Sequence, residues 1–217
     1  KLIAVYGEKK RIPVTFEEIP DNLKNAFIAT EDNRYYQHNG VDYFGLLRAL
    51  KSFLTTGRVS QGGSTITMQV ARNFYLTREK KIIRKLREIL LAYKMENNLS
   101  KERIFELYMN KIYLGHRAYG VAAAAQVYYG KRLSELSLAQ MAMIAGLPKA
   151  PSNYNPISNA NRALQRRDYV LRRMSENNFI SQDEYIAAYL MPVSAQLNSA
   201  TIEFAAPYVS EMARLKM

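Results

Sequence analysis

The sequence IATEDNRYYQHNG, residues 28–40, joins the end of a predicted helix to a polar and aromatic loop. Residues at helical spacing before it predict one inward face: Leu23, Ala26, Phe27 and Thr30. We expect Asp21 to cap the start of this helix. Glu31 continues the inward face, although a buried carboxylate is costly unless it is paired. Glu31 is therefore a candidate general base, and a helix-end acid paired with Arg34 or another cation is the alternative.

Composition and charge limit the classes of protein that fit. The chain has 217 residues, 48% of them hydrophobic, which is enough for one large or two small domains with a real core. The net charge of +12 indicates an anionic partner, such as nucleic acid, an acidic membrane surface or a phosphate-bearing substrate. Residues 72–103 carry ten Lys or Arg and four Glu, so half of the net charge lies in this segment.

Metal-binding and membrane-spanning residues are scarce. The absence of cysteine excludes disulfides and Cys-based metal sites, and two histidines, His38 and His116, cannot form a His-rich metal site. We expect both to be structural. The longest uncharged run, residues 186–202, contains Pro192 and is too polar to span a membrane. The sequence begins without Met or a signal peptide, so we expect an excised piece whose N-terminal anchor is missing.

Two segments after the loop have more than one interpretation. A predicted helix over 43–55 has an apolar stripe that includes Phe44, Leu47 and Leu54, with basic residues on its other side. This pattern fits either a membrane-interface helix or a core-facing helix with a solvated basic side. A Gly-Gly-Ser turn follows, in which we expect Ser64 to cap the next helix, and helix N-termini can bind phosphate.

The predicted helix over 78–97 has two distinct faces. Its expected core face consists of Ile82, Leu86, Ile89 and Tyr93, flanked by Ile83 and Leu90. A second face carries Lys81, Arg84, Lys85 and Glu88. Three cations against one acid exceed what a solvated salt-bridge ladder needs, and this excess suits a diphosphate.

Five segments resemble, in order, the signatures of the peptidoglycan glycosyltransferase domain of class A penicillin-binding proteins and stand-alone glycan polymerases. They are Glu31–Gly40 (Glu-Asp-x-x-Tyr-x-x-His-x-Gly), Gly62–Gln69 (Gly-Gly-Ser-Thr-Ile-Thr-Met-Gln), Arg84–Glu88 (Arg-Lys-x-x-Glu), Lys101–Asn110 (Lys-x-x-Ile-Phe-x-x-Tyr-x-Asn) and Arg166–Leu171 (Arg-Arg-x-x-Val-Leu). Two positions depart from the pattern: Met68 replaces a common Gln, and Phe105 replaces Leu. We expect the fourth segment to serve packing.

The resemblance implies a fold and a reaction. The fold would be mainly α, lysozyme-like and two-lobed, with a cleft between the lobes and a single domain over 1–217. Residues 42–60 would be mobile and membrane-facing, and residues 192–217 would lead into an absent transpeptidase domain. The reaction would polymerise lipid II into β-1,4-linked glycan with inversion and release undecaprenyl diphosphate. Its place would be the extracytoplasmic face of the bacterial inner membrane.

The resemblance also implies residue roles. Glu31 would be the general base, and Arg84, Lys85 and Arg72 would stabilise the departing diphosphate. Glu88 would either orient these cations or hold a divalent metal, Mg²⁺ or Mn²⁺, and the sequence does not decide between the two roles. The substrate-binding candidates are Asp32, Ser64 and Gln69, and Asp32 would also position Glu31 or a nearby Arg.

The implied partners are lipid II, the growing lipid-linked glycan, the membrane surface and cell-wall synthesis proteins, and the family is a target of moenomycin. No organic cofactor is expected.

Two other functions fit parts of the sequence. A glycan hydrolase would also place a Glu in a helical cleft, but a neutral leaving group has no use for clustered cations. A basic nucleic-acid-binding module is consistent with the net charge, but the sequence contains no recognised nucleic-acid motif and its aromatic residues do not interleave with the basic run. We therefore expect no nucleic-acid partner.

Overall fold

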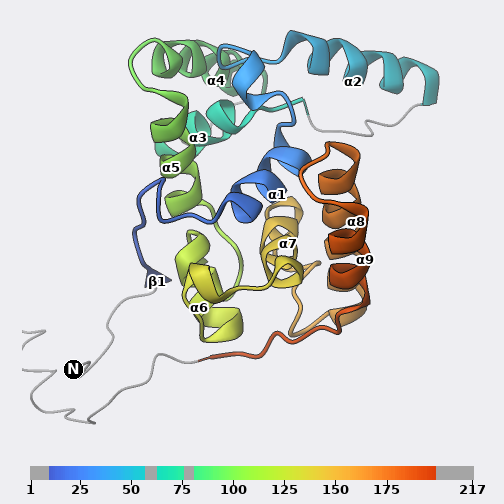
Figure 1. The fold of residues 1–217 in the computed structure, drawn as a ribbon. Coiled ribbons are helices and arrows are strands. Elements are labelled where there is room, and N and C mark those ends of the chain that lie inside the picture. The colour runs from blue at the N-terminus through green and yellow to red at the C-terminus, as the bar shows by residue number, and fades with distance from the viewer. Residues whose placement is uncertain (1–9, 57–62, 76–80, 199–217) are drawn as a thin grey trace, which may run out of the picture.

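The regular secondary structure of the described chain is almost all helical, as the computed structural model in Figure 1 shows. It describes residues 10–56, 63–75 and 81–198. The α-helices of this part of the chain are α1 (Asp21–Glu31), α2 (Tyr43–Thr56), α3 (Ile66–Tyr75), α4 (Lys81–Glu96), α5 (Lys101–Lys111), α6 (Val121–Tyr129), α7 (Leu138–Gly146), α8 (Ala160–Glu176) and α9 (Gln182–Leu190). The shorter elements are strands β1 (Lys10–Arg11) and β2 (Ala118–Tyr119), which pair in parallel, and the 3-10 helices η1 (Tyr35–Gln37), η2 (Leu133–Glu135) and η3 (Leu147–Lys149). The predicted mainly α class is confirmed, and no helix in the described ranges has the length and apolarity needed to cross a membrane.

Helix α1 runs through the middle of the molecule and ends at Glu31, as predicted. Its expected cap was wrong, because Pro20 occupies the capping position and makes no side-chain bond to the helix. Asp21 instead lies in the first turn, where its carboxylate is 2.7 Å from Lys24 Nζ. An acid at this end still favours the helix, because the N-terminus carries partial positive charge.

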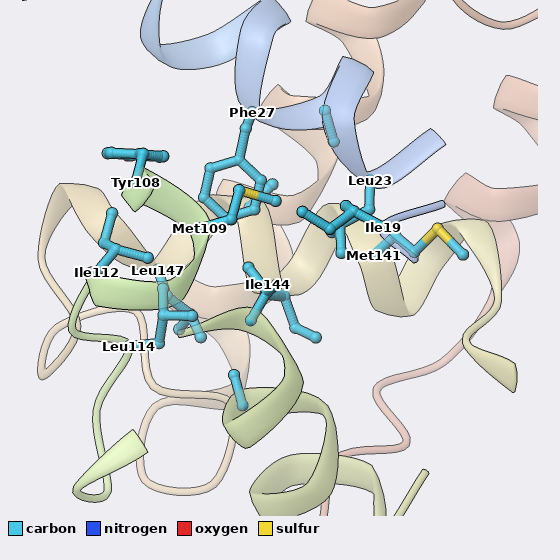
Figure 2. Close-up of a cluster of buried hydrophobic side chains, with 14 of the residues drawn as sticks. Ile19, Leu23, Phe27, Tyr108, Met109, Ile112, Leu114, Met141, Ile144 and Leu147 are labelled. Atoms are coloured by element: carbon cyan, nitrogen blue, oxygen red, sulfur yellow. The ribbon is translucent and has the colours of Figure 1, made fainter. Parts of the chain in front are cut away.

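The main hydrophobic core surrounds the inward face of α1 (Figure 2). Leu23 and Phe27 of α1 are fully buried, and Figure 2 places them among side chains of α5 and α7 such as Met109 and Ile144. Helix α1 packs on α7 and α8, while α3 packs on α4 and α5. The ring of Phe27 also meets the ring of Tyr108 of α5 edge to face, so α1 contacts both groups of helices.

The fourth sequence signature serves packing, as expected. Phe105 and Tyr108 of α5 are fully buried in the main core. The Asn110 side chain accepts a 2.9 Å hydrogen bond from the backbone N–H of Val14 and donates a 2.7 Å hydrogen bond to the backbone carbonyl oxygen of Val14. This segment thus ties the N-terminal part of the described chain to α5.

A second, smaller hydrophobic cluster joins α2, α3 and α4. It contains buried Val41, Met68 and Ala92, with Leu46, Ile89 and Tyr93 packed against it. Met68 is fully buried here, which explains why an apolar residue is accommodated at the position where the family pattern has Gln. The side chain at this position packs in the core and does not line the pocket described below.

The apolar stripes of α2 and α4 face outward. On α2, Phe44, Leu47 and Leu54 are exposed, so the core-facing interpretation of this stripe was wrong. On α4, Leu86 and Leu90 are 59% and 68% exposed, so the expected core face was wrong at these two positions. Ile89 and Tyr93 of that face do pack against the small cluster. The fully inward positions of α4 are instead Glu88, Ala92 and Met95, and the buried Glu88 carboxylate is paired with cations.

Candidate active site

A pocket of about 440 Å³ opens where the C-terminus of α1 meets α3 and α8. Glu31 and Asp32 line it from the end of α1, Ser64 lines it from the turn before α3, and Gln69 and Arg72 line it from α3 itself. Further basic residues come from other elements: Arg48 of α2, Lys149 of η3, and Arg166 and Arg173 of α8. The pocket therefore combines carboxylates with a larger number of cations.

Glu31 is half-buried and is oriented by a residue from another helix. The side-chain amide of Gln69 donates a 3.0 Å hydrogen bond to Glu31 Oε2. Glu31 Oε1 has no hydrogen-bond partner within the described ranges, so this oxygen can accept a proton from a ligand in the pocket. The alternative pairing with Arg34 is not made, because Arg34 lies against Asp42 and the ring of Phe44.

Asp32 connects the end of α1 to the start of α3. Its buried carboxylate accepts from His38 Nε2, at 2.9 and 3.0 Å to its two oxygens, and from the backbone N–H of Ile66 at 3.0 Å. Ile66 is the first residue of α3, so Asp32 satisfies one of the N–H groups that a helix start leaves unpaired. The carboxylate beside Glu31 in sequence thus fixes the helix that carries Gln69.

The turn before α3 places two hydroxyl groups in different roles. Thr65 accepts a 3.1 Å hydrogen bond from the backbone N–H of Met68 and is the helix cap, so the prediction of Ser64 as the cap was wrong by one residue. Thr65 also donates to the carbonyl of Gly40, which holds the turn against the first signature. The Ser64 hydroxyl is left for Lys85, whose Nζ donates to it at 2.6 Å.

Lys85, Arg84 and Glu88 of α4 form one ion cluster beside Ser64. Lys85 Nζ lies 3.2 Å from Glu88 Oε2, and Arg84 Nε lies 3.8 Å from Glu88 Oε1. Glu88 is only 3% exposed, whereas both cations are partly exposed. The buried Glu88 carboxylate therefore fixes the two cations, and their exposed sides remain accessible to a ligand.

This donor set does not suit a divalent metal at Glu88. Both carboxylate oxygens already face cations, and the described ranges contain no group of three His, Asp or Glu side chains arranged to hold a metal ion. Mg²⁺ and Mn²⁺ prefer several oxygen ligands.

Arg72 is exposed on α3 and lines the pocket. Tyr108 of α5 is fully buried, and its hydroxyl has no hydrogen-bond partner within the described ranges. Burial raises the pKa of Tyr108 well above its usual value, the negative charge of Glu31 raises it further, and the positive charge of Arg72 opposes both. Tyr108 consequently stays neutral.

All eight sequence-predicted site residues lie either in the pocket or in the ion cluster that adjoins it. Glu31, Asp32, Ser64, Gln69 and Arg72 line the pocket directly. Arg84, Lys85 and Glu88 adjoin it through the Lys85–Ser64 hydrogen bond.

Sequence reasoning missed the basic residues contributed by α8 and η3. The fifth signature contains two arginines with different fates: Arg167 is buried and donates to the carbonyl of Tyr189 at 2.7 Å and to Asp168 at 2.8 Å, whereas Arg166 lines the pocket. Arg166, Tyr169 and Arg173 share one helical face, and this i, i+3, i+7 spacing was the available signal.

Comparisons with known proteins identify the family of the chain. A family model described as transglycosylase matches residues 1–175. Penicillin-binding protein 1A of Haemophilus influenzae is 54% identical over 217 residues, all of this chain and 25% of that protein. Penicillin-binding protein 1A of Escherichia coli is 52% identical over 217 residues, all of this chain and 26% of that protein. The chain therefore spans about a quarter of the length of these curated relatives.

A solved structure resembles the fold. The crystal structure of penicillin-binding protein 1A from Haemophilus influenzae matches with a TM-score of 0.57 and 37% sequence identity. The match covers 100% of this chain and 22% of the solved chain. The helical arrangement is thus similar to one that occurs inside a longer protein.

Proposed function

The chain belongs to the transglycosylase family, and we propose that it is a peptidoglycan glycosyltransferase domain that polymerises glycan strands with Glu31 as its general base. The observation that carries this proposal is the pairing of Glu31 with Gln69 inside a pocket rich in cations. The Gln69 amide holds Oε2 and leaves Oε1 to accept the proton of an incoming hydroxyl group. A base must reach that proton directly, so orientation matters as much as basicity.

The proposed reaction joins lipid II to a growing glycan on undecaprenyl diphosphate. The 4-hydroxyl oxygen of the acceptor sugar attacks the anomeric carbon of the donor, and its proton passes to Glu31. The bond between that carbon and the phosphate oxygen breaks, and the diphosphate leaves with the electron pair. An α-linked donor becomes a β-1,4 linkage in one inverting step, so no covalent intermediate is needed.

The leaving group needs positive charge more than it needs an acid. We propose that Lys85 and Arg84 stabilise the negative charge on the departing diphosphate, with Arg72 at the pocket wall contributing. Ser64 holds the Lys85 ammonium from one side and Glu88 from the other. Fixed cations of this kind do not have to reorganise as charge develops, which is why they lower the barrier.

The exposed apolar residues of α2 and α4 support a membrane-facing surface. Phe44, Leu47 and Leu54 of α2 and Leu86 and Leu90 of α4 are exposed in the same part of the molecule that carries the diphosphate cations. We propose that this surface meets the outer leaflet side of the inner membrane, where a lipid-linked substrate is available. In this proposal the small α2–α4 cluster and the main core form the two lobes of a lysozyme-like fold.

A glycan hydrolase remains the second candidate, because it would use the same Glu. The cation cluster beside Ser64 argues against a hydrolase, because Lys85 and Arg84 would not stabilise a neutral sugar leaving group. The products separate the two: a polymerase lengthens glycan chains and a hydrolase shortens them.

The decisive experiment is polymerisation of purified lipid II by the full-length protein and by Glu31→Gln. We expect the variant to lose about 10²- to 10⁴-fold in rate with an unchanged circular dichroism spectrum. Glu17→Gln is the matched control, because Glu17 is exposed and lies outside the pocket. A Glu31→Gln variant as active as the parent would show that another residue is the general base. A parent that makes no polymer would contradict the polymerase assignment.

A further inference from the structure

Arg166 is held in a fixed orientation at the pocket wall. Its Nε donates a 3.2 Å hydrogen bond to the carbonyl of Gly146, and its guanidinium carbon lies 4.6 Å from the ring centroid of Tyr169 and 5.9 Å from that of Tyr154. A Cβ atom at position 146 would lie 2.9 Å from Arg166 Cγ, so only glycine lets the side chain cross the end of α7 without a shift. The two terminal nitrogens remain for a ligand.

The positive charge of Arg166 is not neutralised by a neighbour. Within residues 10–56, 63–75 and 81–198 it has no acidic partner, whereas Arg167 pairs with Asp168, and Arg172 and Arg173 pair with Glu176. Lys149 of η3 lines the same pocket, is exposed and likewise makes no ion pair with a described residue. Two unpaired cations on the pocket wall favour an anionic ligand.

We propose that Arg166 and Lys149 form a second oxyanion subsite, which binds a carboxylate or phosphate of the substrate other than the departing diphosphate. This inference rests on the proposed function. Figure 1 shows α3 and α8 on either side of α1, so Arg166 of α8 lines a different wall of the pocket from Gln69 and Arg72 of α3. The planar guanidinium fork matches the two oxygens of a carboxylate or phosphate.

The chemistry of peptidoglycan offers two sources of such an anion. One is a carboxylate of the peptide attached to the glycan, and the other is a phosphate of the second lipid diphosphate in the complex. Because the Arg166 side chain is already immobilised, binding loses little side-chain entropy and the subsite adds to substrate affinity in the ground state. The effect should therefore appear in KM and not in kcat.

The kinetic test compares Arg166→Gln with Arg162→Gln in the full-length protein. Arg162 is exposed on the same helix, four residues earlier, and does not line the pocket, so the two variants lose the same charge. We expect Arg166→Gln to raise KM for lipid II about tenfold with kcat within about twofold, and Arg162→Gln to match the parent. Gly146→Ala should raise KM in the same direction, because it displaces Arg166 without removing charge.

A binding test separates the sources of the anion and does not depend on turnover. Calorimetry would measure a lipid-free disaccharide-peptide, the same compound with its peptide carboxylates amidated, and inorganic diphosphate. If Arg166→Gln weakens the binding of only the compound with free carboxylates, the anion is a peptide carboxylate. If it weakens the binding of only diphosphate, the anion is a phosphate. A parent that binds these probes but makes no polymer would contradict the proposed function and not this subsite.

Three outcomes would overturn the subsite. The first is unchanged binding of all three probes by Arg166→Gln. The second is an equal loss in Arg162→Gln, which would indicate a general charge effect. The third is weaker probe binding in Arg166→Gln and Gly146→Ala that is fully accounted for by a lower thermal unfolding midpoint of these variants. In that case Arg166 would be a structural residue that ties α8 to Gly146.

Discussion

The side-chain amide of Gln69, on α3, donates a 3.0 Å hydrogen bond to Oε2 of Glu31, the last residue of α1. The two helices are fixed relative to each other at this point, because the carboxylate of Asp32 accepts from the first N–H group of α3. The orientation of the proposed base therefore depends on the position of a second helix.

Replacing Gln69 should mainly lower kcat. Gln69→Met keeps a side chain of similar size but removes the amide donor, so the Glu31 carboxylate can rotate away from its productive orientation. We expect kcat to fall about 10- to 100-fold, because small displacements of a catalytic group are costly, with KM changed less. Steady-state polymerisation kinetics check this, with Gln165→Met, at an exposed position of α8, as the control. Parent-like kcat in Gln69→Met would show that the amide does not orient the base.

Lys85 should contribute to the chemical step. Lys85→Ala removes the ammonium that Ser64 and Glu88 hold in place, so less positive charge faces the departing diphosphate. We expect kcat to fall about 10²- to 10³-fold, which is typical for the loss of one donor that stabilises a developing negative charge. Lys94→Ala on the same helix is the control, because Lys94 is exposed and away from Ser64. Full activity in Lys85→Ala would contradict the diphosphate assignment.

Glu88 should act through the cations and not through a metal. Glu88→Gln leaves Arg84 and Lys85 without the buried charge that orients them, and we expect activity to fall at least tenfold. The measurement is polymerisation against Mg²⁺ concentration, including samples treated with a chelator. An orienting role predicts the same Mg²⁺ dependence in parent and variant. Recovery of Glu88→Gln at high Mg²⁺ would instead indicate that Glu88 is a metal ligand.

Much of the fold follows from local sequence pattern. The end of α1 at Glu31 and the helices around the five signatures were predictable, because helical spacing and turn residues are local properties. The sequence also indicated Lys85 and Glu88 as neighbours, since residues three apart on a helix share a face. Their contact with Ser64 was not predictable, because it depends on how α4 packs against the turn before α3.

The predictions from sequence that were wrong or incomplete share a physical cause: each depends on contacts between segments distant in the sequence or on backbone geometry. Helical periodicity reveals an apolar stripe but not what covers it, so Leu86 and Leu90 were expected in the core although they are exposed. In the turn before α3, two adjacent residues, Ser64 and Thr65, both have a hydroxyl that can cap a helix, and backbone geometry decides between them. The position of Arg166 at the pocket depends on the end of α7, which lies 20 residues earlier in the sequence.

Two buried tyrosines, Tyr108 of α5 and Tyr128 of α6, differ in the hydrogen bonding of their hydroxyl groups. The hydroxyl of Tyr128 donates a 2.8 Å bond to the carbonyl of Leu114, whereas the hydroxyl of Tyr108 has no partner within the described ranges. Tyr128→Phe leaves a buried carbonyl unsatisfied, so we expect it to lower the free energy of unfolding by about 1–2 kcal/mol. Tyr108→Phe removes a hydroxyl that burial only penalises, so we expect no loss and up to about 1 kcal/mol of gain. Urea denaturation of both variants measures this difference. A loss of stability in Tyr108→Phe as large as that in Tyr128→Phe would show that the Tyr108 hydroxyl has a partner in solution, and Glu31 is the first candidate, because its charge acts on that hydroxyl.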